Sequence, residues 1–435
     1  MSEADTRVRG RFGPGRIRAP AVAGLAVAAL LSGCAGGGGT RVSLEAGDVE
    51  FDRPTPSGEP YLSVGAGGRA ILTWIEPEGG VPALRLAIRG EDGWSEPRTV
   101  WASEEMFVNW ADFPSSVEMR DGTLAVHWLE KVADAPYAYH VMLALSSDDG
   151  ATWSEPFRAH DDASPTEHGF VSMVPWGDGA GLTWLDARAM AGDAGGEHLA
   201  GGDEALVGGG GGERGAMSVR FRTLAPDGHL GPEVLLDDRT CECCQTALVR
   251  VGEGLVTAYR DRSETEVRDI AVVRGAGERW TEPAPLSTDG WVIPGCPVNG
   301  PQLSGDDRTL AAAWYTGVDG APQVYAAFSA DGGTIFGPRI RVDEGLPLGR
   351  VDVERLDDGS AVVVWLEASN DTPRVLARRV DPDGSLGTPL LISETAGERS
   401  SGFPRMVRTG DEFLFAWTIP GEGGGVRVRA VRLSD

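Results

Sequence analysis

Basic residues are scarce in this sequence of 435 residues. Its 39 lysines and arginines stand against 65 aspartates and glutamates, so the formal net charge at pH 7 is −26. A protein that binds nucleic acid presents a basic surface to the phosphates, so we expect no nucleic-acid partner. We interpret the excess negative charge as a contribution to solubility.

Long apolar runs are also few. The run "AVAGLAVAALLSG" (21–33) follows five arginines within the first 18 residues. It is too short to span a bilayer stably, and its basic flank is typical of an export signal. Elsewhere no run approaches the roughly 18 apolar residues that a membrane helix needs, so we expect no other spanning segment.

The apolar run ends in "LSGC" (Leu31–Cys34), which resembles a bacterial lipobox. The resemblance implies that residues 1–34 are a signal peptide and that Cys34 carries a lipid. Ala35, in place of Asp, favours the outer membrane by the same resemblance. Residues 35–40 are rich in glycine and predict a flexible tether. We therefore expect a cell-envelope protein, facing the periplasm or the exterior, that contacts the membrane through its lipid alone.

Glycine and proline are abundant, with 62 and 28 residues, and the 13 tryptophans outnumber the 6 tyrosines. This composition favours an all-β protein with many turns. Seven segments end in an aromatic residue after small or β-branched residues, in most cases about 50 residues apart. These residues are Trp74, Trp128, Trp184, Tyr259, Trp314, Trp365 and Trp417. Each complete unit has four short predicted strands, which predicts a β-propeller of four-stranded blades, with seven blades favoured over six.

The seventh unit has only three predicted strands. The segment "RVSLEAG" (41–47) is similar to "PRIRVDEG" (338–345) and "TPLLISE" (388–394), which hold the fourth-strand position in other units. We expect this N-terminal segment to supply the missing strand and close the ring, which removes an exposed sheet edge. Residues 41–435 would then form one propeller domain.

Two turns between third and fourth strands carry a sharper signal. "SSDDGATW" (146–153) and "SADGGTIF" (329–336) follow the Asp-box pattern S-x-D-x-G-x-T-W, and "EDGW" (91–94) and "GERW" (277–280) are shorter variants. From residue 41 to its end, the chain resembles the sialidase-like, BNR-repeat β-propeller lipoproteins of bacteria. Runs such as "NWADFPSS", "CCQTA" and "GCPVNGP" add to the resemblance. Asp boxes are structural turns, so they indicate the fold and not a reaction.

In a propeller, the loops that lead into the innermost strands share one face with the loops that join second and third strands. Arginine is suited to bidentate binding of carboxylates, and several arginines fall in these loops. We therefore predict a ligand site there, and the alternative is that strand-end Arg–Asp pairs hold the blades together. The predicted ligand-binding residues are Arg188, Arg260, Arg262, Arg350, Asp186, Asp261 and Trp110, with Arg405, Glu130 and Asp352 nearby.

The sialidase resemblance implies particular roles at this face. Sialidases bind the substrate carboxylate with three arginines and use an acid/base residue and a tyrosine nucleophile activated by a glutamate. The candidates here are Asp112 as acid/base and Tyr259 or Tyr315 as nucleophile, with Glu264 as a further catalytic candidate. The Arg-Ile-Pro motif of sialidases is absent, and "FDRPTP" (51–56) is a poor substitute. The sequence thus predicts a monomer that binds or hydrolyses an anionic glycan, by exo-sialidase chemistry if it is an enzyme.

A cysteine cluster supports a second hypothesis. Besides Cys34, the chain has Cys241, Cys243, Cys244 and Cys296, which fall before the innermost strands of adjacent units. An oxidising compartment permits disulfides, and bridges from the cluster to Cys296 are favoured because vicinal pairing is strained. A thiolate site for copper or zinc and a redox function are the alternatives, although C-x-C-C is not the usual C-x₂-C zinc spacing. In this hypothesis the propeller is non-catalytic and uses the cluster, or its face, for metal, redox or protein partners.

One long loop, residues 187–217, is rich in glycine and has almost no apolar anchors. We expect it to overhang the ligand-binding face as a lid. His198 in this loop and His168 at the rim of the face are candidate metal ligands, and the alternative is that neither has such a role.

Overall fold

The computed structural model describes residues 43–54, 56–191 and 215–434, which belong to one compact unit, Arg41–Asp435. Cys34, His198, the predicted signal peptide, the tether and most of the 187–217 loop lie outside the described residues, so the assignments made for them stay predictions. Among the described residues, no helix has the length and apolar character needed to cross a membrane.

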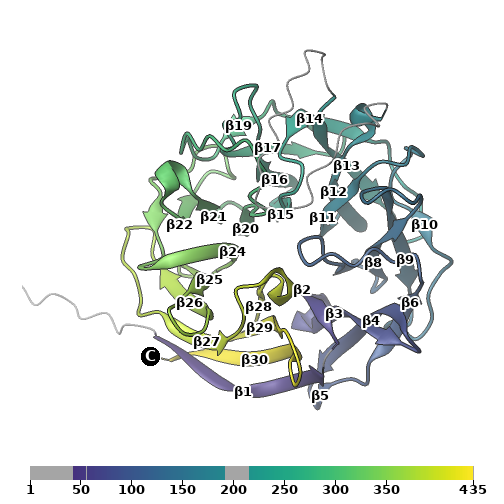
Figure 1. Ribbon diagram of the computed structural model, residues 1–435, viewed down its shortest axis with the longest axis horizontal. Coiled ribbons are helices and arrows are strands. Elements are labelled where there is room, and N and C mark those ends of the chain that lie inside the picture. Colours follow the sequence, from purple (N-terminus) through teal and green to yellow (C-terminus); the bar gives the residue numbers. More distant parts are fainter. Residues whose placement is uncertain (1–42, 55, 192–214, 435) are drawn as a thin grey trace, which may run out of the picture. The chain divides into compact units, whose positions relative to one another are not determined.

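Seven antiparallel sheets surround a central axis, with one strand of each sheet innermost (Figure 1). The all-β fold and the seven blades are therefore confirmed, and the helical elements of the described part are four short 3-10 turns. Blades 1 to 3 comprise β2 (Gly58–Val64), β3 (Ala70–Glu78), β4 (Val81–Gly90), β5 (Gly93–Trp94) and β6 (Arg98–Ala102); β7 (Ser115–Glu118), β8 (Leu124–Lys131), β9 (Tyr139–Ser146) and β10 (Phe157–Arg158); and β11 (His168–Trp176), β12 (Gly179–Asp186), β13 (Met217–Leu224) and β14 (Val234–Thr240).

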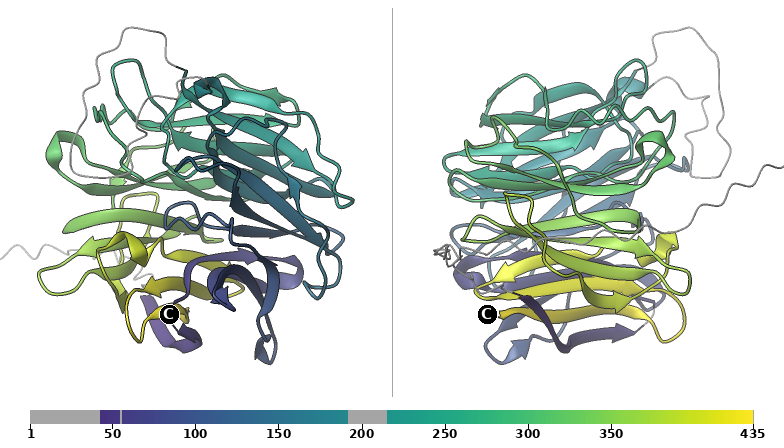
Figure 2. Two further views of the ribbon diagram at one scale, coloured as in Figure 1. Left: turned by 45° about the vertical axis from the view of Figure 1, so that its right-hand side comes forward. Right: turned by 90° about the vertical axis from the view of Figure 1, so that its left-hand side faces the viewer.

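The second half of the chain continues the pattern around the ring, as the side views of Figure 2 show. Blades 4 to 6 comprise β15 (Ala247–Val251), β16 (Gly254–Arg260), β17 (Ile270–Ala276), β18 (Arg279–Trp280) and β19 (Ala284–Pro285); β20 (Gln302–Gly305), β21 (Leu310–Thr316), β22 (Gln323–Ser329) and β23 (Ile340–Arg341); and β24 (Leu346–Arg355), β25 (Ala361–Ala368), β26 (Arg374–Val380) and β27 (Leu390–Glu394).

Blade 7 joins the two ends of the described chain. It contains β28 (Arg405–Thr409), β29 (Glu412–Ile419), β30 (Gly425–Ser434) and, as its outer strand, β1 (Ser43–Pro54). β1 pairs antiparallel with β30 from Ser43 opposite Ser434 to Pro54 opposite Gly425. The predicted closure by an N-terminal strand is confirmed, and the strand extends seven residues beyond the predicted segment, since it runs to 54 instead of 47.

The aromatic residues that predicted the repeat lie on the second strand of each blade. Six of them are among the largest fully buried side chains, namely Trp74, Trp128, Trp184, Tyr259, Trp314 and Trp365. Because each indole packs between neighbouring sheets, its burial stabilises the contact between blades as well as its own blade.

In three blades the buried indole N–H donates a hydrogen bond to a carboxylate two residues further along the strand. The residues i and i+2 of a strand face the same side, so the carboxylate lies where the indole needs an acceptor. The pairs are Trp74 with Glu76 (2.9 Å), Trp184 with Asp186 (2.9 Å) and Trp365 with Glu367 (2.7 Å). These carboxylates therefore have a structural role.

We predict that Glu367→Ala destabilises the protein by about 1–3 kcal/mol, because it leaves the buried Trp365 N–H and the Leu346 backbone N–H without their acceptor. Urea unfolding followed by tryptophan fluorescence measures the change. The matched control is Glu422→Ala, which alters an exposed glutamate and is expected to shift stability by less than about 0.5 kcal/mol. Equal unfolding midpoints for the two variants would contradict the structural role of this carboxylate.

Candidate functional site at the channel mouth

The inner strands of all seven blades line a cavity of about 210 Å³ on the central axis. The chain enters each inner strand at one end of this channel, which is the end predicted to hold the ligand site. Every blade contributes a side chain that contacts the cavity. One residue from each blade in turn is Tyr61, Asp112, Phe170, Gln245, Gln302, Asp352 and Arg405.

Three of the inner strands begin with the same irregularity. The strand register shifts between Gly58 and Tyr61, between Gly169 and Ser172, and between Gly349 and Asp352. Each shift contains a residue other than glycine with positive φ, namely Glu59 (52°), Phe170 (53°) and Arg350 (55°). Bulges of this kind redirect side chains, and left-handed backbone in a residue with a Cβ is strained and concentrated at functional sites.

The carboxyl groups in the channel hold protons at higher pH than usual. Burial raises the pKa of Asp352, although Arg405 lies 3.3 Å from its Oδ2 atom. Burial and the charge of Asp352 raise the pKa of Glu354 to about 8, and Glu354 accepts a hydrogen bond from Ser304 at 2.9 Å. The channel therefore carries less negative charge than its residue types suggest.

Asp112 lies at the mouth and has an unusual environment. Its Oδ1 accepts the Phe170 backbone N–H at 2.7 Å, and its buried Oδ2 has no hydrogen-bond partner among the described residues. Burial raises its pKa well above the usual range. A side chain at Gly169 would overlap Oδ2, so the carboxyl group depends on that glycine. Burial therefore favours the protonated form of Asp112, which is the state a proton donor requires.

An aromatic stack with two arginines extends from the channel, where Tyr61, Phe113 and Arg405 contact the cavity together with Asp112. The ring centroids are 5.8 Å apart for Trp110 and Phe403, 5.7 Å for Phe403 and Phe113, and 6.0 Å for Phe113 and Tyr61. Two guanidinium groups lie over the rings at opposite ends of the stack. Arg350 lies 4.7 Å above Trp110, and Arg405 lies 5.0 Å above Tyr61 and 5.3 Å above Phe113.

Arg350 is buried and lacks an acidic partner. Its Nη1 donates to the backbone oxygens of Glu398 (3.1 Å) and Gly402 (2.9 Å) and to Ser401 Oγ (2.6 Å). Within the described ranges, no carboxylate forms a salt bridge with it and no acceptor contacts its Nε or Nη2. Burial and the nearby charge of Arg399 lower its pKa to about 10, so the positive charge is uncompensated.

The other predicted arginines have partners. Arg188 forms a bidentate pair with Asp186 (2.7 and 2.6 Å), and Arg262 contacts Glu266 and Glu242. Arg260 donates instead to the backbone oxygens of residues 268, 299 and 315 at 2.6–3.0 Å. These guanidinium groups hold loops and strands together, which matches the structural alternative for this face.

The remaining predicted acidic residues lie at strand ends or turns. Glu130 accepts the indole N–H of Trp101 at 3.0 Å. Asp261 accepts the Arg262 backbone N–H at 2.7 Å, and burial raises its pKa. Glu264 is exposed in a turn, and no hydrogen bond joins it to Tyr259 or Tyr315 in the described structure.

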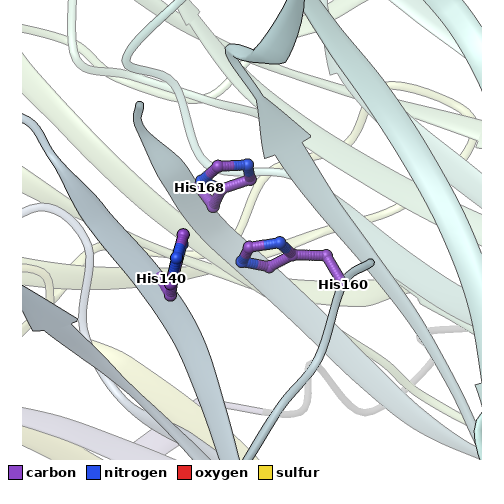
Figure 3. Close-up of side chains that lie close together, drawn as sticks. All are labelled: His140, His160 and His168. Atoms are coloured by element: carbon purple, nitrogen blue, oxygen red, sulfur yellow. The ribbon is translucent and has the colours of Figure 1, made fainter. Parts of the chain in front are cut away.

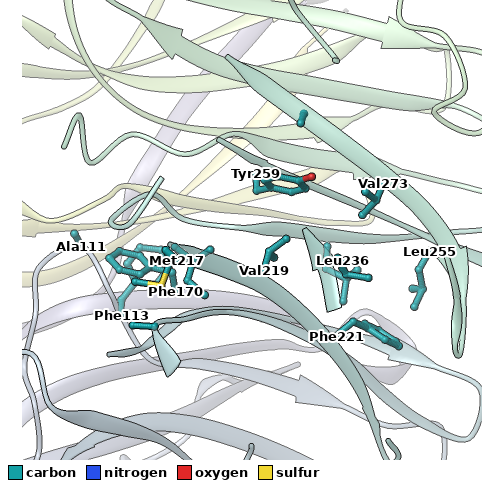
Figure 4. Packing of buried hydrophobic residues seen from close by; sticks show 14 of the residues in the cluster. Ala111, Phe113, Phe170, Met217, Val219, Phe221, Leu236, Leu255, Tyr259 and Val273 are labelled. Carbon is teal, nitrogen blue, oxygen red and sulfur yellow. The ribbon is translucent and has the colours of Figure 1, made fainter. Parts of the chain in front are cut away.

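The predicted tyrosines are poorly placed to act as nucleophiles. Tyr259 is 1% exposed within an apolar cluster between blades 3 and 4 (Figure 4), and its hydroxyl donates to Asp237 at 2.7 Å. Burial raises the pKa of Tyr259 strongly and also raises that of Tyr315, whose ring packs against Trp291. Both hydroxyls therefore keep their protons at neutral pH.

A Tyr–Glu pair that the sequence analysis missed lies close to Asp112. Tyr139 on β9 donates its hydroxyl to Glu167 at 2.7 Å. Burial raises the pKa of Glu167 to about 7, and burial and Glu167 raise that of Tyr139. The two residues come from adjacent blades and are 28 positions apart, so no local spacing marks them as a pair.

The cysteines meet beside the channel as predicted from their place in the repeat. Cys243 and Cys296 form a disulfide with their Cα atoms 6.0 Å apart, so a bridge links the loops that precede blades 4 and 5. Cys241 and Cys244 are buried thiols with sulfurs 2.7 Å apart, and Cys241 Sγ lies 4.0 Å from Cys243 Sγ. Although burial opposes it, the Cys244 thiol and the charge of Arg268 lower the pKa of Cys241, while burial raises that of Cys244.

Comparisons with known proteins show similarity in fold. No protein-family model and no curated protein matches this chain. A protein of unknown function from Dyadobacter fermentans is 12% identical, with a TM-score of 0.50 over 90% of this chain and 99% of that chain. The polysaccharide lyase Uly1 is 8% identical, with a TM-score of 0.50 over 88% and 91%. The NanB sialidase from Streptococcus pneumoniae is 10% identical, with a TM-score of 0.46 over 90% and 94%. At these identities the similarity concerns the β-propeller fold alone.

We predict two alkylatable thiols in the denatured, unreduced protein and four after reduction, with Cys34 excluded from the count. Intact mass after iodoacetamide treatment measures both numbers. In a Cys296→Ser control, Cys243 loses its partner and the unreduced count rises to three. An unreduced count of zero would show instead that Cys241 and Cys244 form a second disulfide.

A second prediction concerns pH. The pKa of Glu354 is raised from 4.5 to about 8 in the folded state, so its contribution to stability is full below the unfolded pKa and is lost as pH rises through 8. The free energy of unfolding of the wild type relative to Glu354→Gln should therefore fall with pH, by up to about 1.4 kcal/mol per unit. Urea unfolding at about pH 5.5, 7 and 8.5 tests this. Parallel pH profiles for the two proteins would show that Glu354 titrates normally.

Proposed function

We propose that this protein binds an anionic glycan at the channel mouth. In this proposal Arg350 binds a carboxylate of the sugar, and Trp110 packs against the sugar ring. The observation that carries the proposal is the buried, uncompensated charge of Arg350 in a chain with 65 acidic residues. A carboxylate from a ligand would supply the counter-ion that Arg188 and Arg262 find within the protein.

The backbone around Arg350 supports this role. Its φ of 55° is a strained conformation, and three contacts from its Nη1 hold the guanidinium in place over Trp110. Such an arrangement keeps the arginine oriented before the ligand arrives, which reduces the entropy lost on binding. Trp110 is partly exposed, so part of its ring remains accessible to a sugar.

The same geometry supports binding better than hydrolysis. Burial raises the pKa of Asp112, which favours the protonated form that a general acid needs. A retaining hydrolase also needs a nucleophile on the reacting carbon. No glutamate accepts a hydrogen bond from Tyr259 or Tyr315 in the described structure, and Tyr139, which donates to Glu167, is fully buried. We therefore propose Asp112 as a hydrogen-bond donor to the glycan, with a lectin-like function at this mouth.

Isothermal titration with 3′-sialyllactose, a tri-galacturonate and the neutral sugar lactose tests the proposal. We expect binding of an acidic sugar and at least tenfold weaker binding of lactose. Arg350→Gln should weaken acidic-sugar binding by about tenfold or more, since a charge-assisted hydrogen bond contributes about 1.5–3 kcal/mol. Trp110→Ala should weaken binding of the same sugar as well.

The matched control is Arg120→Gln, which makes the same charge change at an exposed turn after β7, at the far end of the channel. Unfolding midpoints of all variants establish that they are folded. Binding that is unchanged by Arg350→Gln, or failure of the wild type to bind either acidic sugar, would reject the proposal.

A further inference from the structure

A cluster of three histidines lies between blades 2 and 3 (Figure 3). His140 is on β9, His160 follows β10, and His168 begins β11. One ring nitrogen from each residue lies within 4.8 Å of the other two. The chain has 6 histidines in all, so half of them meet at this one place. Of these three histidines, the sequence analysis named only His168 as a candidate metal ligand.

The histidines are buried, and hydrogen bonding accounts for few of their nitrogen atoms. The relative exposures of His140, His160 and His168 are 7%, 2% and 0%. Nδ1 of His140 and Nδ1 of His160 have no hydrogen-bond partner in the described structure. The Val141 N–H lies 3.4 Å from Nε2 of His160, which is long for a hydrogen bond. Buried polar nitrogens without partners are rare in native proteins and call for an explanation.

His168 is oriented as a metal ligand usually is. Its Nδ1 faces only backbone oxygens, those of Thr166 at 3.0 Å and Tyr139 at 3.2 Å, so this nitrogen carries the proton and donates. A ligating histidine typically donates its second nitrogen to a carbonyl in this manner. Nε2 then faces Asp162 Oδ2 at 3.0 Å and Asp186 Oδ1 at 3.8 Å. A neutral ring would place a lone pair against a carboxylate, so this position suits a cation.

We propose that His140, His160, His168 and Asp162 form a binding site for a divalent transition-metal ion, with zinc as the best fit. Three imidazoles and one carboxylate are a ligand set that suits tetrahedral zinc, and copper and nickel also bind imidazole well. Ligand atoms in such a site lie roughly 3.3 Å apart, so the ring nitrogens, now within 4.8 Å of one another, have to move closer when the ion binds. Four protein ligands leave no open position, which is typical of a structural site.

One further feature bears on binding. The rings of His160 and His168 are parallel, with centroids 3.8 Å apart and an angle of 4° between their planes. An ion cannot lie between rings stacked in this way, so binding requires one side chain to rotate out of the stack.

The position of the site indicates what the ion would do. His140 belongs to blade 2 and His168 to blade 3, while His160 and Asp162 lie on the connection between them. An ion bound to all four would fix this connection against both blades. The site is separate from the channel mouth, so the proposal stands independently of glycan binding.

Equilibrium dialysis of the full-length chain against Zn²⁺, followed by elemental analysis, tests the proposal. We expect one zinc per chain, and a higher thermal unfolding midpoint with zinc than with a chelator. His140→Ala and Asp162→Asn should each weaken zinc binding by tenfold or more and reduce the rise in midpoint. Asp162→Asn changes a partly exposed residue and so keeps the test valid if a histidine variant fails to fold. His229→Ala, at an exposed position, is the matched control.

Co²⁺ distinguishes this site from the cysteine cluster. Binding by histidine and carboxylate gives the visible bands of tetrahedral cobalt without a strong near-ultraviolet thiolate band. Absence of stoichiometric zinc in the wild type would overturn the proposal. So would zinc that persists in His140→Ala and Asp162→Asn, or a thiolate band that disappears in Cys241→Ser.

Discussion

The antiparallel pairing of β1 with β30 is the contact on which the rest of the molecule depends. It completes the seventh sheet and brings the first and last blades side by side. The channel mouth is a direct product of that closure. Arg405 at the start of β28 lies over the Tyr61 ring on β2, although 344 residues separate them in the chain. Without the closing strand, residues from blades 1 and 7 would have no reason to meet.

Many carboxylates of this acidic chain form ion pairs within the protein. At the blade edges arginines pair with carboxylates such as Glu76 and Asp186, and the indoles of the second strands donate hydrogen bonds to the same carboxylates. The channel differs, because burial disfavours the charged forms of Asp112, Asp352 and Glu354 and raises the pKa of each. Arg350 and Arg260 differ from both patterns, since each is buried and donates only to uncharged oxygens in the described structure, and burial lowers the pKa of Arg350.

The fold could be predicted because its signals are local and repeated. An aromatic residue, a tryptophan in six of the seven units, recurs in most cases about 50 residues apart, so the blade number followed from counting. The proximity of Cys243 and Cys296 could also be predicted, because equivalent positions in successive blades are neighbours. The site itself was harder. Whether an arginine is free or paired depends on carboxylates from other strands, as the partners of Arg188 and Arg262 illustrate.

The residues that sequence analysis missed share that difficulty. Tyr139 and Glu167 meet across two blades, and the cluster of His140, His160 and His168 combines a strand, a loop and the start of the next sheet. One pattern could have been used and was not: an acidic residue two positions after the strand tryptophan, at Glu76, Asp186 and Glu367, which marks Asp186 as a structural partner of Trp184.

The glycine beside Asp112 has a consequence for how such a protein can evolve. A Cβ atom at Gly169 would occupy the space of the Asp112 carboxyl group, and Gly345 and Glu367 repeat the arrangement elsewhere in the ring. The two positions of each pair should therefore change together in evolution, because a larger residue at the glycine fits only if the acidic side chain moves or becomes smaller. Relatives that keep Asp112 must keep Gly169, and the two positions should vary together across any future alignment.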